Sequence, residues 1–185
     1  MGIIGDSLEQ AAAKTATRPI PKSAGAQMRF LVKQHKGSTK AVAQLLGVSQ
    51  RTVERYVKDQ IRRPRRELAA RMEREVRKRW QPRVRQRAQQ RAAQRTGITI
   101  ETRARFGFTA APGTTDDGRI RLITQHLPPQ YAARLFDAQA AGATEQQLQN
   151  IAAEGLQEIY FKDSGRRADG LLVEFTDIDY AELDF

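Results

Sequence analysis

Eight polar and charged residues between positions 49 and 63 have the side chains needed to contact DNA. They are Ser49, Gln50, Arg51, Glu54, Arg55, Lys58, Arg62 and Arg63. A glutamine amide can pair with the edge of adenine, and an arginine guanidinium with the edge of guanine. Arginine and lysine also bind phosphate, which holds a protein on the duplex without reading its sequence. These residues are candidate DNA contacts, and the alternative interpretation is an ordinary solvated helix face.

The stretch STKAVAQLLGVSQRTVERYVK, residues 38–58, has the pattern of a helix-turn-helix that would position these side chains. Ser38 or Thr39 can cap a first helix, and Ser49 can cap a second. Gly47 supplies the tight turn between them, where a positive φ costs least. The expected inward residues are Val42, Ala43, Leu46, Val53 and Tyr56. In such a motif the second helix enters the major groove, so the opposite face of that helix would meet DNA.

A second candidate site is the segment TAAPGTTDDG, which lies between two predicted strands. Thr114 and Thr115 place two hydroxyls beside the carboxylates of Asp116 and Asp117. Taken alone, the segment reads as a turn, since Asp and Gly are normal turn residues. Hairpin loops of this length are nevertheless uncommon without a function. Threonine is a weak nucleophile, so a reaction at either hydroxyl would need a base or a metal to activate it.

Charge is distributed unevenly along the chain. The 185 residues carry 32 Lys and Arg against 21 Asp and Glu, a formal charge of +11. Residues 1–105 hold 26 basic and 8 acidic side chains, a net +18, whereas residues 106–185 hold 6 and 13. The first half therefore attracts polyanions, with nucleic acid the natural partner, and the second half repels them. No long apolar helical face accompanies the charge, so a membrane partner is not expected.

Several classes of site are missing from the sequence. The chain has no Cys, which excludes disulfides and Cys-ligated zinc. No apolar run approaches the ~20 residues of a membrane span. Residues 1–21 contain no signal-peptide core, and we expect a cytoplasmic protein. The absence of a Gly-rich phosphate loop, HExxH and GxSxG disfavours a self-contained enzyme, and we expect no intrinsic cofactor or metal.

We predict an α+β protein with four parts. Residues 1–21 would form an N-terminal helix and a Pro-containing linker, and residues 22–63 the all-α helix-turn-helix domain. Residues 64–96 would form a long basic helix, which Pro82 would kink or split. This Arg-rich segment could lie along DNA phosphates or act as a solvated connector. Residues 97–185 would form a small α+β domain.

The predicted C-terminal domain is a three-stranded antiparallel sheet with two helices on one face. Its strands are predicted from alternating apolar residues. The expected inward residues are Ile98, Ile100, Thr102, Ala104, Phe106 and Phe108 in the first strand, Ile120 and Leu122 in the second, and Leu171, Val173 and Phe175 in the third. The first helix would run from Pro128 to about Ala140. The second would be capped by Thr144 with Gln147, and an acidic tail would follow the last strand.

Six strings of the sequence resemble the telomere terminal proteins (Tpg type) of linear Streptomyces chromosomes and plasmids. They are GSTKAVAQLLGVSQRTVERYVK, EVRKRWQP, GITIETRARFGF, TAAPGTTDD, ITQHLPPQYAARLFDAQAAGA and LLVEFTDIDY. The resemblance runs from about Pro19 to Tyr180 and is weakest at the N-terminus and in the Arg/Gln segment. It implies a protein covalently bound to DNA 5′ ends, which primes the end-patching synthesis of linear replicons.

By the same resemblance, a threonine of the TAAPGTTDD loop carries the first nucleotide. Its position in the motif assigns this role to Thr114, with Thr115 as second choice. The implied partners are telomeric DNA, a telomere-associated protein and a DNA polymerase. The chain would then be a co-substrate rather than an enzyme, with Mg²⁺ and a deoxynucleotide held at the polymerase site. Asp116 and Asp117 would help to hold Mg²⁺ or shape the turn. The first nucleotide, the preferred telomere sequence and the oligomeric state stay open.

Two other functions explain part of the sequence. A helix-turn-helix transcriptional regulator would carry the same DNA-binding half with a ligand-binding or dimerisation domain. It does not explain the net +18 of residues 1–105, which exceeds what one recognition helix requires. An architectural DNA-binding protein would use the Arg-rich segment to coat DNA. A covalent protein–DNA adduct would separate priming from both alternatives.

Overall fold

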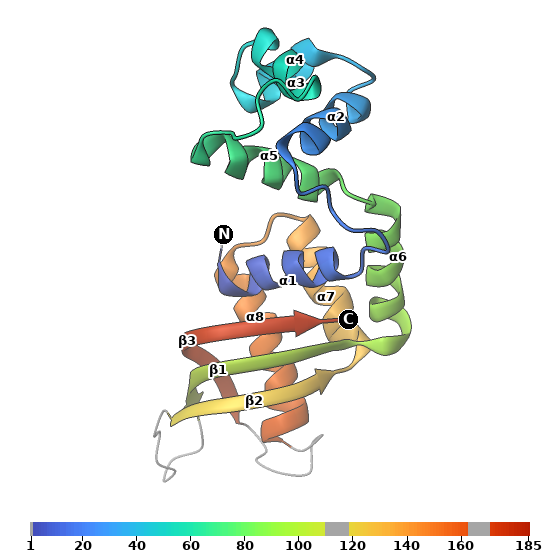
Figure 1. Cartoon of the computed structure of the whole chain (residues 1–185). Coiled ribbons are helices and arrows are strands. Elements are labelled where there is room, and N and C mark those ends of the chain that lie inside the picture. Colours follow the sequence, from blue (N-terminus) through green and yellow to red (C-terminus); the bar gives the residue numbers. More distant parts are fainter. Residues whose placement is uncertain (1, 110–118, 163–170) are drawn as a thin grey trace. The chain divides into compact units, whose positions relative to one another are not determined.

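The computed structural model describes residues 2–109, 119–162 and 171–185. The chain divides into two compact units, whose elements are labelled in Figure 1. We call Ala16–Pro82 the helical unit, and Met1–Thr15 together with Arg83–Phe185 the sheet unit. The two segments of the sheet unit thus flank the helical unit in sequence.

The helical unit is built from four amphipathic helices around one core. They are α2 (Ala24–Gln34), α3 (Thr39–Leu46), α4 (Gln50–Val57) and α5 (Arg66–Arg79). Apolar residues recur at intervals of three or four, so each helix has one apolar stripe to bury. The buried set comprises Ala24, Met28, Leu31, Val42, Ala43, Leu46, Val53, Tyr56, Leu68, Met72 and Val76. The inward residues predicted for residues 38–58 are therefore confirmed.

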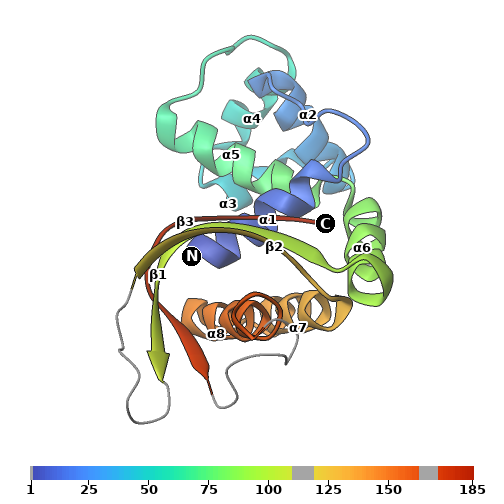
Figure 2. The same cartoon turned by 90° about the horizontal axis from the view of Figure 1, so that it is seen from below.

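The sheet unit combines helices with a three-stranded antiparallel sheet. Its elements are α1 (Ile3–Lys14), α6 (Pro82–Arg91), the π-helical turn η1 (Ala92–Thr96), β1 (Ile98–Thr109), β2 (Arg119–Leu127), α7 (Pro129–Ala140), α8 (Glu145–Leu156), the π-helical turn η2 (Gln157–Phe161) and β3 (Leu172–Asp184). The strand order is β2-β1-β3. Figure 2 shows α7 and α8 on one side of the curved sheet. This confirms the predicted α+β arrangement of a sheet with two helices against it.

The central strand β1 has the alternating face that its sequence predicts. Ile98, Ile100, Thr102, Ala104 and Phe106 are buried, and each is separated from the next by a residue that is more exposed. The buried hydroxyl of Thr102 donates to the backbone oxygen of Tyr180 at 2.9 Å. Its polar group is therefore satisfied inside an apolar core.

The prediction that Ile120 and Leu122 of β2 point into the core is wrong. Ile120 and Leu122 have exposed fractions of 52% and 67%, whereas Ile123 is buried. Directly opposite residues of antiparallel strands point to the same side of a sheet. Leu122 lies opposite the outward Arg103, and Ile123 lies opposite the inward Thr102. Pairing with β1, rather than the local alternation of β2, therefore decides which residues of β2 are buried.

The last strand continues through the predicted acidic tail. Val173 and Phe175 are buried as predicted, and Leu171 packs partly buried against the same core. The strand then runs on to Asp184, with Ala181 and Leu183 also buried. Two register shifts against β1 interrupt the pairing between the two buried pairs. The acidic residues of the tail thus lie on the exposed side of an edge strand.

The N-terminal helix, predicted with a linker over residues 1–21, packs against the sheet. Ile4, Leu8 and Ala11 are fully buried in the same core as the strands. Figure 1 shows α1 running beside β3. An amphipathic helix of this length gains most of its stability by burying its apolar face, and the sheet supplies the surface.

The basic segment 64–96 is split into two helices just before Pro82, one of the two outcomes predicted for this proline. The break lies at Trp80 and Gln81, and Gln81 has φ 44°, which no α-helix can include. Pro82 then starts α6, as a proline can begin a helix but not continue one. The Trp80 ring packs edge-on against Phe30 with centroids 5.0 Å apart, which anchors the end of α5 in the helical unit. The α-helical residues of α6 include no buried side chain.

Candidate nucleic-acid interface

Helices α3 and α4 are joined by a turn that requires glycine. Gly47 has φ 62° and ψ 42°, in the left-handed region. The next residue, Val48, donates its backbone N–H to the oxygen of Ala43 at 3.0 Å and so closes the end of α3. Ser49 then starts α4, and its Oγ accepts from the backbone N–H of Thr52 at 3.2 Å. The turn thus satisfies backbone groups at both helix ends and holds α4 at a defined angle to α3.

The inner side of α4 is buried in the core of the helical unit. Val53 is fully buried and Tyr56 is 3% exposed. Burial raises the pKa of the Tyr56 hydroxyl, an effect that the charge of Arg55 partly opposes. Tyr56 is therefore a neutral core residue at physiological pH, and α4 cannot rotate without exposing both side chains.

The outer side of α4 and the following segment carry the candidate DNA contacts. Ser49, Gln50, Arg51, Arg55, Lys58, Arg62 and Arg63 are exposed, and Glu54 is half-buried. Arg51, Arg55 and Lys58 follow at intervals of four and three, which places them on one side of the helix. Within the part of the chain that the structure describes, none of these three cations has a carboxylate within ion-pair distance. Their charges are available to a polyanion.

Gln50 differs from the other candidates because its side chain is engaged within the protein. Its Nε2 donates to Thr39 Oγ1 at 3.1 Å and to Glu54 Oε1 at 2.9 Å. Thr39 is the first residue of α3, and Glu54 lies one turn along α4. The amide thereby links the starts of the two helices. Sequence reasoning grouped Gln50 and Glu54 on one face but did not find Thr39 beside them.

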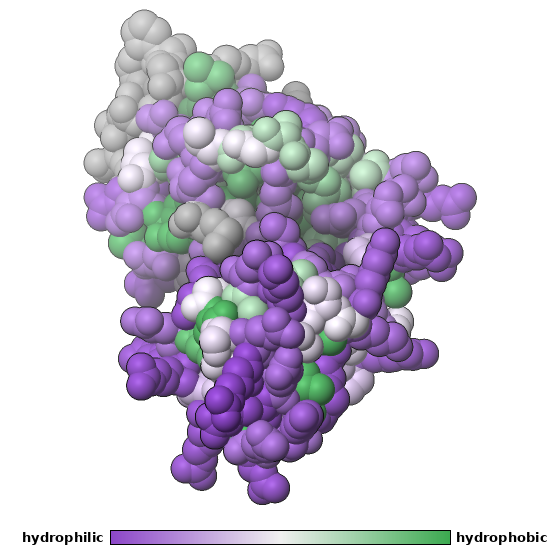
Figure 3. All heavy atoms as spheres, turned by 90° about the horizontal axis from the view of Figure 1, so that it is seen from above, coloured by the Kyte–Doolittle hydropathy of each residue, from purple (hydrophilic) through white to green (hydrophobic). Residues whose placement is uncertain are grey.

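The division into units concentrates the positive charge. The helical unit carries 18 Lys and Arg against 5 Asp and Glu, a formal +13. The sheet unit carries 14 against 16, a formal −2. The face shown in Figure 3 is mostly hydrophilic, with small apolar areas. Electrostatic attraction to a polyanion therefore belongs to the helical unit.

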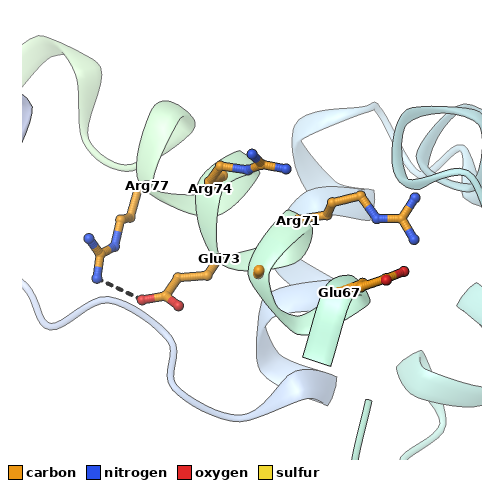
Figure 4. Close-up of a pocket in the computed structure, with 6 residues that line it drawn as sticks. Glu67, Arg71, Glu73, Arg74 and Arg77 are labelled. Carbon is orange, nitrogen blue, oxygen red and sulfur yellow. Dashed lines mark hydrogen bonds and ion pairs between the residues drawn. The ribbon is translucent and has the colours of Figure 1, made fainter. Parts of the chain in front are cut away.

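A polar pocket along α5 adds arginines that sequence reasoning did not single out. Its lining residues are Glu67, Ala70, Arg71, Glu73, Arg74 and Arg77. Figure 4 shows Arg77 paired with Glu73, at 2.6 Å between Nη2 and Oε1. Arg71 reaches the α3–α4 turn, where a Cβ added to Gly47 would lie 2.9 Å from its Nη1. Its Nε is buried without a hydrogen-bond partner among the described residues. The sequence contained no signal for this approach, which depends on how α5 packs.

The second candidate site lies outside the described residues. Thr114, Thr115, Asp116 and Asp117 belong to residues 110–118, which connect β1 to β2. The two strands pair from Ile98 opposite Leu127 as far as Phe106 opposite Arg119. The connection therefore leaves from the end of a long, regular strand pair.

Other polar side chains of the sheet unit have structural partners. Glu145 caps α1, with Oε1 accepting from the Ile4 backbone N–H at 2.7 Å and Oε2 from that of Gly5 at 3.1 Å. The Tyr131 hydroxyl donates to the Glu158 carboxylate. Burial first, and this hydrogen bond second, raise the pKa of Tyr131 well above its usual range. Across residues 2–109, 119–162 and 171–185, no three His, Cys, Asp or Glu side chains gather as metal ligands would.

No described helix combines the length and apolarity needed to cross a membrane. Comparison with known proteins gives no relative from which a function could be carried over. No family model matches the chain, and neither a curated protein nor a solved structure matches it.

Proposed function

We propose that the helical unit is a helix-turn-helix module that binds duplex DNA with α4 in the major groove. The observation that carries this proposal is the two-sided character of α4. Val53 and Tyr56 hold its inner side in the core. Arg51, Arg55 and Lys58 leave its outer side exposed and cationic. A helix held rigidly by its apolar side, with unpaired cations opposite, has the form needed to enter a groove lined by phosphates.

The charge of the helical unit supports the same function. Each Lys or Arg that neutralises a phosphate releases counterions, so DNA binding depends strongly on salt. A formal +13 over 67 residues is more than α4 alone supplies. Arg62 and Arg63, which follow α4, are exposed and would add phosphate contacts on the same unit. DNA affinity should therefore come from many cations of the helical unit, whereas discrimination between bases should come from a few side chains of α4.

The test of DNA binding is a titration of the full chain against a fluorescent duplex at 50 and 200 mM salt. Affinity should fall by roughly 10³ or more over this range. Arg51→Ala and Arg55→Ala should weaken binding. Arg134→Ala is a matched control, since it removes one exposed cation of the sheet unit, which pairs with Glu154. Equal effects of Arg134→Ala and Arg51→Ala would show that overall charge, rather than α4, controls binding.

We further propose that the chain is a protein primer, a telomere terminal protein attached to DNA 5′ ends. The support is the resemblance of its six strings to that family, and TAAPGTTDD above all. The hydroxyl oxygen of Thr114 would attack the α-phosphate of a deoxynucleotide. An Oγ–P bond forms, pyrophosphate leaves, and the hydroxyl proton passes to a base of the partner DNA polymerase. That polymerase would supply Mg²⁺, and a telomere-associated protein would bring the complex to telomeric DNA.

Two tyrosine hydroxyls of the sheet unit, which could compete with Thr114 as primers, are engaged within the protein. A primer hydroxyl must reach a nucleotide that is held in another protein's active site. Tyr131 is buried and bonded to Glu158. The Tyr180 hydroxyl lies on the sheet and donates to Glu101 Oε1 at 3.0 Å. Both tyrosine hydroxyls therefore have partners within the protein, whereas the resemblance assigns the priming role to Thr114.

The test of priming is transfer of label from an α-³²P deoxynucleotide in the presence of the polymerase and the telomere-associated protein. Thr114→Ala should abolish labelling while leaving duplex binding intact. Thr114→Ser keeps a hydroxyl and should retain some labelling, whereas Thr115→Ala should act mainly through the shape of the loop. Protease digestion and mass spectrometry would locate the nucleotide. Label on a tyrosine, or full labelling of Thr114→Ala, would end this assignment.

A protein–DNA adduct that survives boiling in detergent would also separate priming from the two other functions. A transcriptional regulator and an architectural DNA-binding protein both bind DNA without a covalent bond. If duplex binding holds and no adduct forms with the full set of partners, the helix-turn-helix proposal stands and the priming proposal falls.

A further inference from the structure

Gln50 is held on two sides at the start of α4. Its Nε2 lies 3.1 Å from Thr39 Oγ1 and 2.9 Å from Glu54 Oε1. Both distances are those of ordinary hydrogen bonds. One partner comes from the preceding helix and the other from the next turn of the same helix. The amide nitrogen therefore has two partners within the protein before any DNA is present.

The chemistry of Glu54 decides which end of the Gln50 amide faces Thr39 and Glu54. The nitrogen and oxygen of a glutamine amide have nearly the same shape, so the hydrogen-bond network must assign them. A carboxylate only accepts hydrogen bonds, so the group of Gln50 that faces Glu54 must be the NH₂. The hydroxyl oxygen of Thr39 can accept the second N–H. Both amide hydrogens are then used, and Oε1 has no partner among the described residues.

We infer that Gln50 presents only a hydrogen-bond acceptor to the major groove, and that it selects a base carrying an amino group. This inference rests on the proposed DNA binding by α4. In the major groove, adenine offers N6–H₂ and cytosine offers N4–H₂, whereas guanine N7 and O6 and thymine O4 are acceptors. Bidentate pairing with adenine would need one free N–H of Gln50, and none is free. Thr39 and Glu54 are thus positioning residues for base selection.

The first step of the test finds the base that Gln50 contacts. Duplexes bound by the full chain are selected from a randomised library and compared with those bound by Gln50→Ala. One position should lose its preference in Gln50→Ala. In the wild-type selection, this position should hold adenine or cytosine and exclude guanine and thymine. The wild-type preference should persist with Thr39→Ser, which keeps the accepting hydroxyl.

The second step separates acceptor-only contact from bidentate contact. At that position, 7-deazaadenine keeps the N6 amino group and lacks the N7 acceptor. Wild-type affinity should change by less than about twofold, because no N–H of Gln50 reaches N7. Glu54→Ala frees one N–H and should restore bidentate pairing. The variant should then prefer adenine over cytosine and lose about tenfold in affinity with 7-deazaadenine, as expected for a good bidentate pair.

Thr39→Val provides an independent variant, since it removes the other acceptor while keeping the shape of the side chain. It should shift the preference in the same direction as Glu54→Ala, with melting temperatures confirming that each variant folds. Wild-type sensitivity to 7-deazaadenine, or unchanged preferences in both Glu54→Ala and Thr39→Val, would overturn the inference. Selection of a sequence in which no position depends on Gln50 would also overturn it while leaving DNA binding intact. Failure of the chain to bind any duplex would overturn the proposed function as well.

Discussion

The backbone N–H of Leu183 donates a hydrogen bond to the Ser7 hydroxyl at 2.7 Å, across 176 positions of sequence. Both residues are buried, at 1% and 6% exposure. Because β3 is an edge strand, the N–H groups on its outer side have no carbonyl oxygen of a neighbouring strand to accept their hydrogen bonds. Helix α1 supplies the missing acceptor and covers this part of the edge. The first helix is therefore part of the sheet unit both by apolar packing and by hydrogen bonding.

Ser7→Ala should destabilise the sheet unit by about 1–3 kcal/mol, because it leaves the Leu183 N–H buried without an acceptor. Chemical denaturation followed by circular dichroism would measure the loss. Gln10→Ala is the matched control, as Gln10 is an exposed residue of the same helix. Equal stability of the two variants would show that water or another group satisfies Leu183.

Gly97→Ala and Gly142→Ala should differ clearly in cost. Both glycines have positive φ, 71° and 78°. At Gly97 a Cβ would lie 2.2 Å from the Leu127 backbone oxygen, whereas at Gly142 no atom lies within 4 Å. Gly142→Ala should therefore cost only the backbone strain of about 1–2 kcal/mol. Gly97→Ala adds a clash that the paired ends of β1 and β2 cannot relieve. The Gly97→Ala variant should therefore unfold at a markedly lower denaturant concentration than Gly142→Ala. Similar midpoints would contradict the strand pairing at Gly97.

Val53→Asp should disrupt the helical unit, because it buries an unpaired carboxylate where Val53 is fully enclosed. Arg55→Asp places the same side chain on the exposed side of α4 and should leave folding intact. Both variants should lose duplex binding, the first through unfolding and the second through repulsion of phosphate. Thermal melting separates the two causes. Wild-type melting of Val53→Asp would mean that α4 presents a different face to the core.

Tyr131→Phe should cost about 1 kcal/mol at neutral pH, because it removes a hydrogen bond to the carboxylate of Glu158, an exposed residue. The pKa of Tyr131 is raised in the folded state, mainly by burial. The unfolded tyrosine ionises near its ordinary pKa of about 10, so the folded state then binds the extra proton. Stability from this group is thus fully present below about pH 10 and declines as pH rises further. Urea titrations at pH 7 and 10.5 should show a smaller decline in Tyr131→Phe than in wild type. An identical decline would assign the effect to other tyrosines.

Features that depend on residues close together in the sequence were predictable from the sequence alone. The alternation of Ile98, Ile100 and Phe106 identifies the buried face of β1, because side chains of a strand alternate strictly between faces. Thr144 and Gln147 form the expected capping box at the start of α8. These signals lie within one element, where the covalent geometry of the backbone relates one residue to the next.

Other features needed the tertiary structure because they depend on residues that are distant in sequence. The alternation of Ile120 and Leu122 suggested a buried face, but pairing with β1 turned both side chains to the exposed side. The apolar stripe of α1 showed that the helix needs a partner without showing that the partner is the sheet. The amide of Gln50 meets Thr39 only because the turn at Gly47 brings the starts of α3 and α4 together. Local sequence thus determined which side chains were available on each element, whereas the packing of the elements decided which of them are buried, bonded or free.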